Sequence, residues 1–167
     1  TELPLSMIDA IVVRALEEDL GAGDVTTEAC VPEDRMATAD GVARKDIVAC
    51  GLPVAARVFT TIDPSLRFTA KVAEGAKVKG GTVLFTVEGR ARSILIGERV
   101  ALNFIQRMCG VATATARYVA ALPEGSKTRI TDTRKTTPGL RLLERYAVRR
   151  GGGHNHRNDL GSAVLIK

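Results

Sequence analysis

The apolar residues of this chain change their spacing along the sequence, and this change constrains the fold more than any other feature. Residues 6–20 have helical spacing, with Ser6 expected as the N-cap, and Gly21 opens a polar, turn-rich stretch. From residue 37 to residue 87 the spacing is two, which is typical of short strands separated by Gly-containing turns. One helix is expected within that region, over residues 52–61. The pattern predicts a mixed α/β fold.

Helical spacing returns after the predicted strands. Residues 91–108 predict a long helix, Gly110 interrupts the pattern, and residues 113–122 predict a second helix. We expect a domain boundary at this interruption, so that residues 1–107 form one domain and residues 108–167 begin another.

The end of the chain predicts a strand, a helix and a second strand. Residues 128–133 are rich in β-branched side chains, and residues 163–166 form another short apolar run. Between them, Pro138 and the glycines from Gly151 onward fit the start and the end of a helix. A strand–helix–strand unit implies parallel strands, whose carboxyl ends lie at the same edge of a sheet.

Positive charge is concentrated in the same segment. The chain has a net charge of +5, yet residues 128–167 alone contain nine Lys or Arg against three Asp or Glu. Arg134 and Lys135 follow the first predicted strand, and Lys167 follows the second. An Arg fork binds a carboxylate or phosphate bidentately, and Lys acts as a point charge. The sequence therefore predicts a pocket for a small polyanion at this edge.

Other polar residues of the segment are expected to have different roles. The arginines of the predicted helix should form its solvated face, and they are Arg141, Arg145, Arg149 and Arg150. His154 and His156 would need further ligands to hold a metal ion, and none lies near them in the sequence. We expect His156 to form a hydrogen bond instead.

Composition argues against several classes of protein. No apolar run approaches the roughly 18 residues of a membrane-spanning helix, and the first residues lack a signal-peptide pattern. Aromatic residues make up 4% of the chain and Trp is absent, so stacking surfaces for nucleic acid are few. Cys30, Cys50 and Cys109 form no C-x-x-C pair and are expected to be small core residues. These features predict a cytoplasmic protein that binds neither membrane nor nucleic acid.

Three motifs resemble those of the quinolinate phosphoribosyltransferases, also called carboxylating nicotinate-nucleotide pyrophosphorylases. The most specific is TDTRKTTPGLRLLERYAVRRGGGHNHRNDLGSAVLIK at the end of the chain, and EEDLGAGDVTT and GERVALNFIQRMCGVAT support it. The resemblance covers nearly the whole chain. It implies an N-terminal α/β sandwich domain over residues 1–107 and the first part of an α/β barrel over residues 108–167, ending after about two barrel strands.

The resemblance also implies a reaction. The family makes nicotinate mononucleotide from quinolinate and phosphoribosyl pyrophosphate (PRPP), with release of carbon dioxide and pyrophosphate, as a step of NAD biosynthesis. Magnesium is implied as the cofactor that accompanies PRPP, with its ligands expected mostly beyond residue 167 and none within this chain. A homodimer is implied, in which each subunit completes the site of the other.

The resemblance assigns substrate-binding positions to Arg99, Thr133, Arg134, Lys135, His156, Arg157 and Lys167. Arg134, His156 and Arg157 resemble the residues that hold quinolinate, and Lys167 matches a substrate lysine. Lys135, assigned as catalytic, is similar to a residue shared between quinolinate and PRPP, and Thr133 supplies a backbone contact. Arg99 is similar to the arginine that enters the neighbouring subunit's site.

The chain departs from the family's pattern at its C-terminal end, and two alternative functions stay open. The family's barrel continues past the position of Lys167, so we expect a part of a longer protein or a degraded fragment, without turnover on its own. One alternative is a paralogue of the same fold that acts on another anion. The other is a basic module that binds nucleic acid through residues 128–167.

Overall fold

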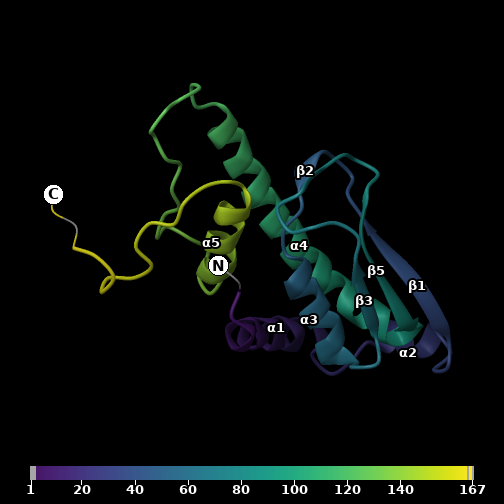
Figure 1. Cartoon of the computed structure of the whole chain (residues 1–167). Helices are drawn as coiled ribbons and strands as arrows, with labels where there is room; N and C mark the ends of the chain where they lie inside the picture. The colour runs from purple at the N-terminus through teal and green to yellow at the C-terminus, as the bar shows by residue number, and fades with distance from the viewer. Residues whose placement is uncertain (1–2, 165, 167) are drawn as a thin grey trace.

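The computed structural model describes residues 3–164 and residue 166, and it has the mixture of helices and strands that the sequence predicts. In chain order they are α1 (Leu5–Leu20), α2 (Val25–Cys30), β1 (Met36–Val42), β2 (Ile47–Val48), α3 (Leu52–Ile62), β3 (Arg67–Ala70), β4 (Lys77–Val78), β5 (Val83–Arg90), α4 (Ala91–Ala120) and α5 (Arg141–Arg150). Figure 1 shows the strands at one end of α4 and α5 at the other, with the C-terminal segment extending away from α5. Pro4 precedes α1, and Ser6 lies inside the helix, so the N-cap expected at Ser6 is wrong.

The strands form two small antiparallel sheets, which confirms the strand region predicted from the period of two. β5 lies between β1 and β3 in the larger sheet, and β2 pairs with β4 in the smaller one. The ladder of β1 and β5 shifts its register between Gly41 and Val42. A Cβ atom at Gly41 would lie 2.0 Å from Cε1 of Phe85, so only glycine lets the strand pass this ring.

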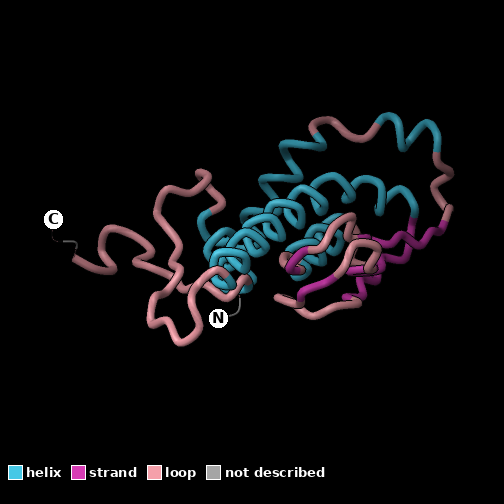
Figure 2. Tube along the Cα trace, turned by 90° about the horizontal axis from the view of Figure 1, so that it is seen from above, coloured by secondary structure: helices cyan, strands magenta, loops and turns pink. Residues whose placement is uncertain are grey.

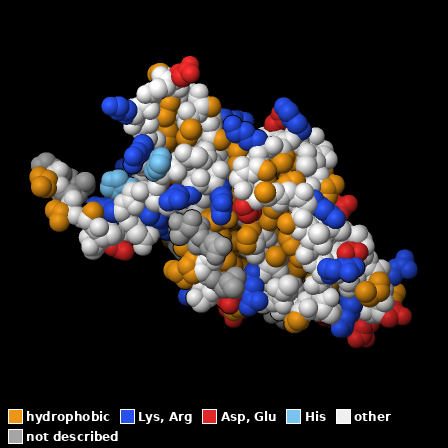
Figure 3. Space-filling model, viewed as in Figure 1, with side chains coloured by type: hydrophobic (Ala, Val, Ile, Leu, Met, Phe, Trp, Pro, Cys, Tyr) orange, Lys and Arg blue, Asp and Glu red, His pale blue; other side chains and the backbone are white. Residues whose placement is uncertain are grey.

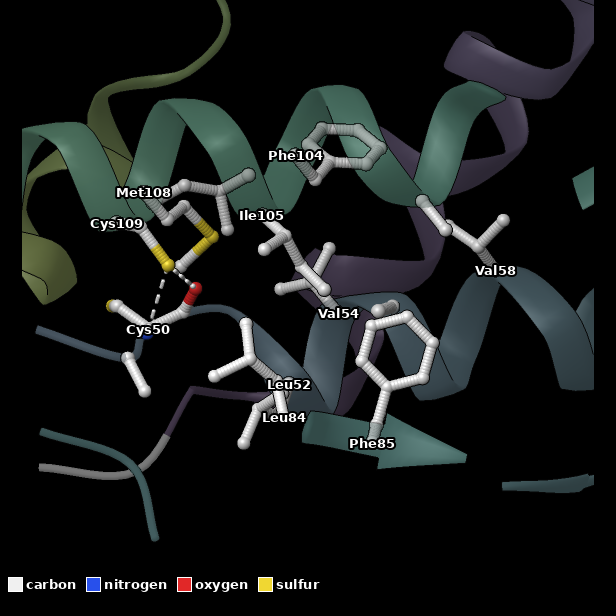
Figure 4. Close-up of a cluster of buried hydrophobic side chains, with 14 of the residues drawn as sticks. Cys50, Leu52, Val54, Val58, Leu84, Phe85, Phe104, Ile105, Met108 and Cys109 are labelled. Carbon is white, nitrogen blue, oxygen red and sulfur yellow. Dashed lines mark hydrogen bonds between the residues drawn. The ribbon is translucent and has the colours of Figure 1, made fainter. Parts of the chain in front are cut away.

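The core of the molecule lies between the larger sheet and the helices α3 and α4, which lie together beside the strands (Figure 2). Val54 and Ile105 meet there from the two helices (Figure 4). Three aromatic rings extend the core toward the sheet, with centroids 4.9 Å apart for Phe68 and Phe85 and 6.2 Å apart for Phe59 and Phe68. Burial of these apolar groups provides the main stabilising free energy of this end of the molecule.

Two of the three cysteines belong to the core, as the sequence predicts. The backbone N–H of Cys50 donates to Sγ of Cys109 at 3.3 Å, and that thiol donates to the Cys50 carbonyl at 3.3 Å (Figure 4). Burial raises the pKa of both thiols, which keeps them neutral and poorly nucleophilic. Cys30 is exposed, so the core position expected for it is wrong.

α4 is one continuous helix, so the break expected at Gly110 is wrong. Gly110 is exposed, whereas Met108, Cys109 and Ala112 around it are buried. Packing of these side chains offsets the roughly 1 kcal/mol that an interior glycine costs a helix. The domain boundary expected between residues 107 and 108 therefore falls inside a helix, and the division into domains stays a prediction.

α5 is attached to the rest of the molecule by a partly buried polar group and by close backbone packing. The carboxylate of Glu74 accepts hydrogen bonds from the backbone N–H groups of Gly51 and Leu52, at the start of α3, and from the Tyr146 hydroxyl of α5 at 3.0 Å. At the end of α5, a Cβ atom on Gly151 would lie 2.3 Å from the carbonyl oxygen of Ala112 in α4. These contacts fix the position of α5 against α3 and α4.

The two strands expected on either side of α5 are not formed in the described part of the chain. Within residues 128–133, Thr131 makes a single parallel bridge with His154. Val164 and Ile166 are 89% and 91% exposed and belong to no strand, and Leu165 and Lys167 lie outside the described residues. A strand forms only where a second strand satisfies its backbone N–H and C=O groups, and these segments lack one among the described residues. The helix predicted between them is confirmed as α5.

Candidate anion-binding site

Two loops meet beside α5, which we call the first site loop (residues 131–137) and the second site loop (residues 154–158). The backbone N–H of His154 donates to the carbonyl of Ile130 at 2.8 Å, and the N–H of Asp132 donates to the carbonyl of His154 at 3.0 Å. The loop of Arg134 and Lys135 is therefore adjacent to the loop of Arg157, through a single bridge and not through two strands. Lys167, the other cation expected at this edge, lies outside the described residues.

Asp132 is the centre of the contact between the loops. Its side chain is 3% exposed and lies 3.1 Å from Nη1 of Arg145. It also accepts hydrogen bonds from the backbone N–H of His156 at 2.7 Å and from Nδ2 of Asn155 at 2.6 Å. One carboxylate of the first site loop thus binds both the second site loop and α5.

Two arginines of α5 hold the backbones of both site loops. Arg145 donates to the carbonyls of His156 at 3.0 Å and Arg157 at 3.2 Å. Arg141 donates to the hydroxyl of Thr136 and to the carbonyls of Arg134 and Asn158, at 3.0, 3.2 and 3.3 Å. The solvated role expected for these two arginines is wrong, because they satisfy loop carbonyls that secondary structure leaves unpaired.

The other two arginines of α5 differ from this pair. Arg149 is exposed, as predicted. Arg150 is half-buried, and its guanidinium lies 4.7 Å from the centre of the Tyr146 ring, so its expected solvated role is also wrong.

Arg134 carries the clearest sign of a ligand. Its Nε atom is buried, and the described residues offer it no hydrogen-bond partner. Buried N–H groups are almost always paired, and an unpaired one needs an explanation such as a bound ligand. A carboxylate or phosphate oxygen would satisfy this donor with a charge-assisted hydrogen bond.

The structure brings five of the seven predicted site residues together in the two loops, namely Thr133, Arg134, Lys135, His156 and Arg157. The Thr133 hydroxyl accepts from the backbone N–H of Lys135 at 3.1 Å, which leaves the exposed ammonium of Lys135 outside this turn. Nη1 of Arg157 donates to the carbonyl of Ala163 at 3.1 Å, and His156 is exposed. In Figure 3 the two histidines lie among Lys and Arg side chains near the C-terminal segment.

The remaining two predicted residues are not part of this cluster. Lys167 lies outside the described residues, and Arg99 is exposed on α4, where no contact of the described chain joins it to the site loops. Arg107, which the sequence did not indicate, does reach them from a position about 12 Å further along α4. Its Nη2 donates to the Thr137 hydroxyl at 2.9 Å and its Nε donates to Glu144 at 3.0 Å.

Glu144 is charged although it is buried. Burial alone would raise the pKa of this carboxyl, but hydrogen bonds from Arg107 and Thr137 outweigh it and hold the pKa below its usual range. The backbone N–H of Thr137 also donates to this carboxylate at 3.3 Å. The first site loop is thereby joined to α4 as well as to α5.

The described residues contain no group of three or more His, Cys, Asp or Glu side chains placed to hold a metal ion. None of the described helices is long and apolar enough to cross a membrane. The arrangement of an α/β sandwich followed by two loops that each carry an arginine defines an α/β protein whose site is suited to small anions.

Comparison with known proteins identifies the family. A family model described as the N-terminal domain of quinolinate phosphoribosyl transferase matches residues 24–109, and one for its C-terminal domain matches residues 111–167. The chain belongs to the quinolinate phosphoribosyl transferase family.

Individual relatives agree with this assignment. The chain is 46% identical over 164 residues to a probable carboxylating nicotinate-nucleotide pyrophosphorylase of Synechocystis sp., and 45% identical over 157 residues to the Mycobacterium leprae enzyme of that name. These matches cover 98% and 92% of this chain but 55% of each relative, so the chain spans about half the length of the curated relatives it matches.

Solved structures confirm the predicted fold class. NadC of Streptococcus pyogenes and the nicotinate-nucleotide pyrophosphorylase of Francisella tularensis both superpose with a TM-score of 0.93. They are 41% and 39% identical to this chain, covering 98% and 99% of it, and it covers 58% of each.

Proposed function

We propose that this chain contributes to an enzyme that transfers the phosphoribosyl group of PRPP to quinolinate with decarboxylation, which yields nicotinate mononucleotide, carbon dioxide and pyrophosphate for NAD biosynthesis. The buried, unpaired Nε of Arg134 next to the cationic second site loop carries this proposal. Membership of the family and the printed names of the relatives support it.

Each site loop would bind one of the two carboxylates of quinolinate. Arg134 of the first site loop and Arg157 of the second would each bind one carboxylate, and His156 and Lys167 would add hydrogen bonds and charge. This orients the ring nitrogen toward C1 of the ribose, a positioning effect that contributes several kcal/mol to catalysis.

Lys135 is the residue proposed to act on the reacting groups. As the ring nitrogen forms its bond to C1, the bond from C1 to pyrophosphate breaks, and the ammonium of Lys135 would stabilise the charge on the leaving oxygen. Thr133 would contribute through the turn that fixes Lys135. The carboxylate next to the ring nitrogen then leaves as carbon dioxide, and its electron pair is accepted by the positively charged ring.

Magnesium does not fit the described residues as a resident ion. Asp132, the acidic residue of the first site loop, is already bound to Arg145 and Asn155. We propose that magnesium is held by PRPP and by residues outside this chain, and no step above depends on it.

We also propose that the enzyme is a homodimer in which Arg99 enters the partner's site. Arg99 is exposed, and among the described residues no hydrogen bond or ion pair joins it to the site loops of its own chain. Mixing Arg99→Ala subunits with Arg134→Ala subunits should restore activity, because one site of the heterodimer then has both residues intact. Each variant alone should be nearly inactive. If mixing restores nothing, Arg99 acts within its own subunit or not at all. Cytoplasmic location and the absence of nucleic-acid binding stay predictions.

Titration calorimetry on the polypeptide at the full length of its relatives tests the substrate. We expect saturable binding of quinolinate, and formation of nicotinate mononucleotide once PRPP and magnesium are added. Binding of duplex DNA that weakens steeply with salt, without any quinolinate heat, would instead indicate a nucleic-acid-binding module.

A further inference from the structure

Two arginines of α5, Arg141 and Arg145, make an unusual set of contacts, because each of them bonds to both site loops. Arg145 lies 3.1 Å from Asp132 of the first site loop and donates to the carbonyls of His156 and Arg157 of the second. Arg141 donates to Arg134 and Thr136 of the first loop and to Asn158 of the second. The acceptors are backbone carbonyls, one hydroxyl and one carboxylate.

Bonds to the backbone fix where a loop lies without using the side chains that could bind a ligand. Three of the four carbonyls held by α5 belong to Arg134, His156 and Arg157, whose side chains are the proposed quinolinate contacts, and the fourth belongs to Asn158. The ion pair of Arg145 with Asp132 is largely shielded from water, with side chains 14% and 3% exposed. Low exposure strengthens such a pair and makes the separation of the loops well defined.

We propose that Arg145 and Arg141 are positioning residues that set the separation between Arg134 and Arg157, and so select an aromatic acid with two neighbouring carboxylates. This inference rests on the proposed function, since it assumes that quinolinate spans both loops. In that assignment pyrophosphate meets Lys135 on the first loop alone. A change in the separation of the loops should therefore weaken quinolinate binding more than PRPP binding.

Arg145→Lys is the most direct test, made in the polypeptide at the full length of its relatives. Lysine keeps the charge beside Asp132, but its single ammonium cannot reproduce the rigid fork that bonds two carbonyls and a carboxylate. We expect KM for quinolinate to rise about tenfold, on the scale of one lost charge-assisted hydrogen bond, while KM for PRPP changes less than about threefold. The thermal midpoint should stay within about 4 °C of wild type.

Arg149→Lys is the matched control, because Arg149 lies on the same helix but is exposed, and it should leave both KM values unchanged. Arg141→Lys is the second variant, and its expected effect on KM for quinolinate has the same direction. If Arg145→Lys does not fold, Arg141→Lys decides the question.

Three results would overturn the inference. Equal increases in both KM values would show general damage to the site, and unchanged KM values with normal quinolinate binding would show that the loops do not depend on α5 for their separation. A wild-type protein that does not bind quinolinate would overturn the inference together with the proposed function, which distinguishes this case from the other two.

Discussion

The two halves of α4 are held in place by different kinds of contact. The N-terminal half packs against α3 and the larger sheet through apolar side chains, and Phe59, Phe68 and Phe85 stack beside it. The second half holds the first site loop through Arg107, near the middle of the helix, whose guanidinium bonds to Glu144 and Thr137. Leu143 and Ala147 of α5 are buried there as well, so the first half is a core, and the second adds a network of ion pairs and hydrogen bonds to apolar packing.

The apolar contacts mainly stabilise the fold, whereas the hydrogen bonds and ion pairs mainly position the site loops. Apolar burial is non-directional, so it stabilises a fold without fixing single atoms closely. Hydrogen bonds depend on distance and angle, and a network of them holds loop atoms in a defined place. A site that must present several cations to one ligand benefits from the second kind of contact.

The largest effect should follow from a change in the apolar end. Phe59 is 2% exposed, and Phe59→Ala should lower the free energy of unfolding by about 3–5 kcal/mol, because it leaves a cavity between α3 and the sheet. Urea unfolding followed by circular dichroism measures this, with Phe59→Leu as a milder control. The folded variant should bind quinolinate like wild type. If its quinolinate affinity fell as strongly as its stability, the apolar core and the site would not be independent, contrary to this account.

A smaller effect on stability, with a local effect on the site, should follow from Glu144→Gln. This change removes the charge that pairs with Arg107, and we expect a loss of about 1–3 kcal/mol in the free energy of unfolding. Hydrogen exchange should increase in the first site loop and remain unchanged in β5. The exposed Glu124→Gln serves as control. If hydrogen exchange in the first site loop is the same in both variants, Glu144 has no role in holding the loop.

The smallest expected effect is a dependence of the free energy of unfolding on pH, and it arises from Asp63 at the apolar end. Hydrogen bonds from the hydroxyl and backbone N–H of Ser65 and from the Ser93 hydroxyl lower the pKa of Asp63 to about 2. The carboxylate therefore stabilises the fold above the ordinary Asp pKa of 3.8, and this contribution is lost as the pH falls through about 2. Unfolding free energies of wild type and Asp63→Asn should differ most above pH ~5 and converge toward pH ~2. A difference in unfolding free energy that does not depend on pH would show that the charge of Asp63 does not contribute to stability.

The sequence was sufficient for much of the apolar end, because spacing reports burial directly. The helices predicted over residues 6–20 and 52–61 are α1 and α3, and the region with a period of two forms the sheets. α2 was missed because its sequence is polar and short, although Asp24 is an N-cap whose side chain accepts from the backbone N–H of Thr27 at 3.0 Å. That cap was the available signal.

The site was predicted less completely, because its contacts depend on long-range polar partners. The motif indicated Arg134 and Arg157, and the loops that carry them are adjacent. Helical spacing showed only that Arg141 and Arg145 lie away from Leu143, and it could not show that loop carbonyls would cover them. The strand expected over residues 128–133 was wrong because β propensity does not supply a pairing partner.

The central claim is that the two site loops together bind a dicarboxylate, and quinolinate titration of Arg134→Ala tests it most directly. The matched control is Arg129→Ala, which removes an exposed arginine from the same segment. We predict that loss of the Arg134 guanidinium weakens binding by about 2–5 kcal/mol, as for other truncated charge pairs, while the control binds like wild type. An Arg134→Ala protein that binds quinolinate with unchanged affinity would contradict the account.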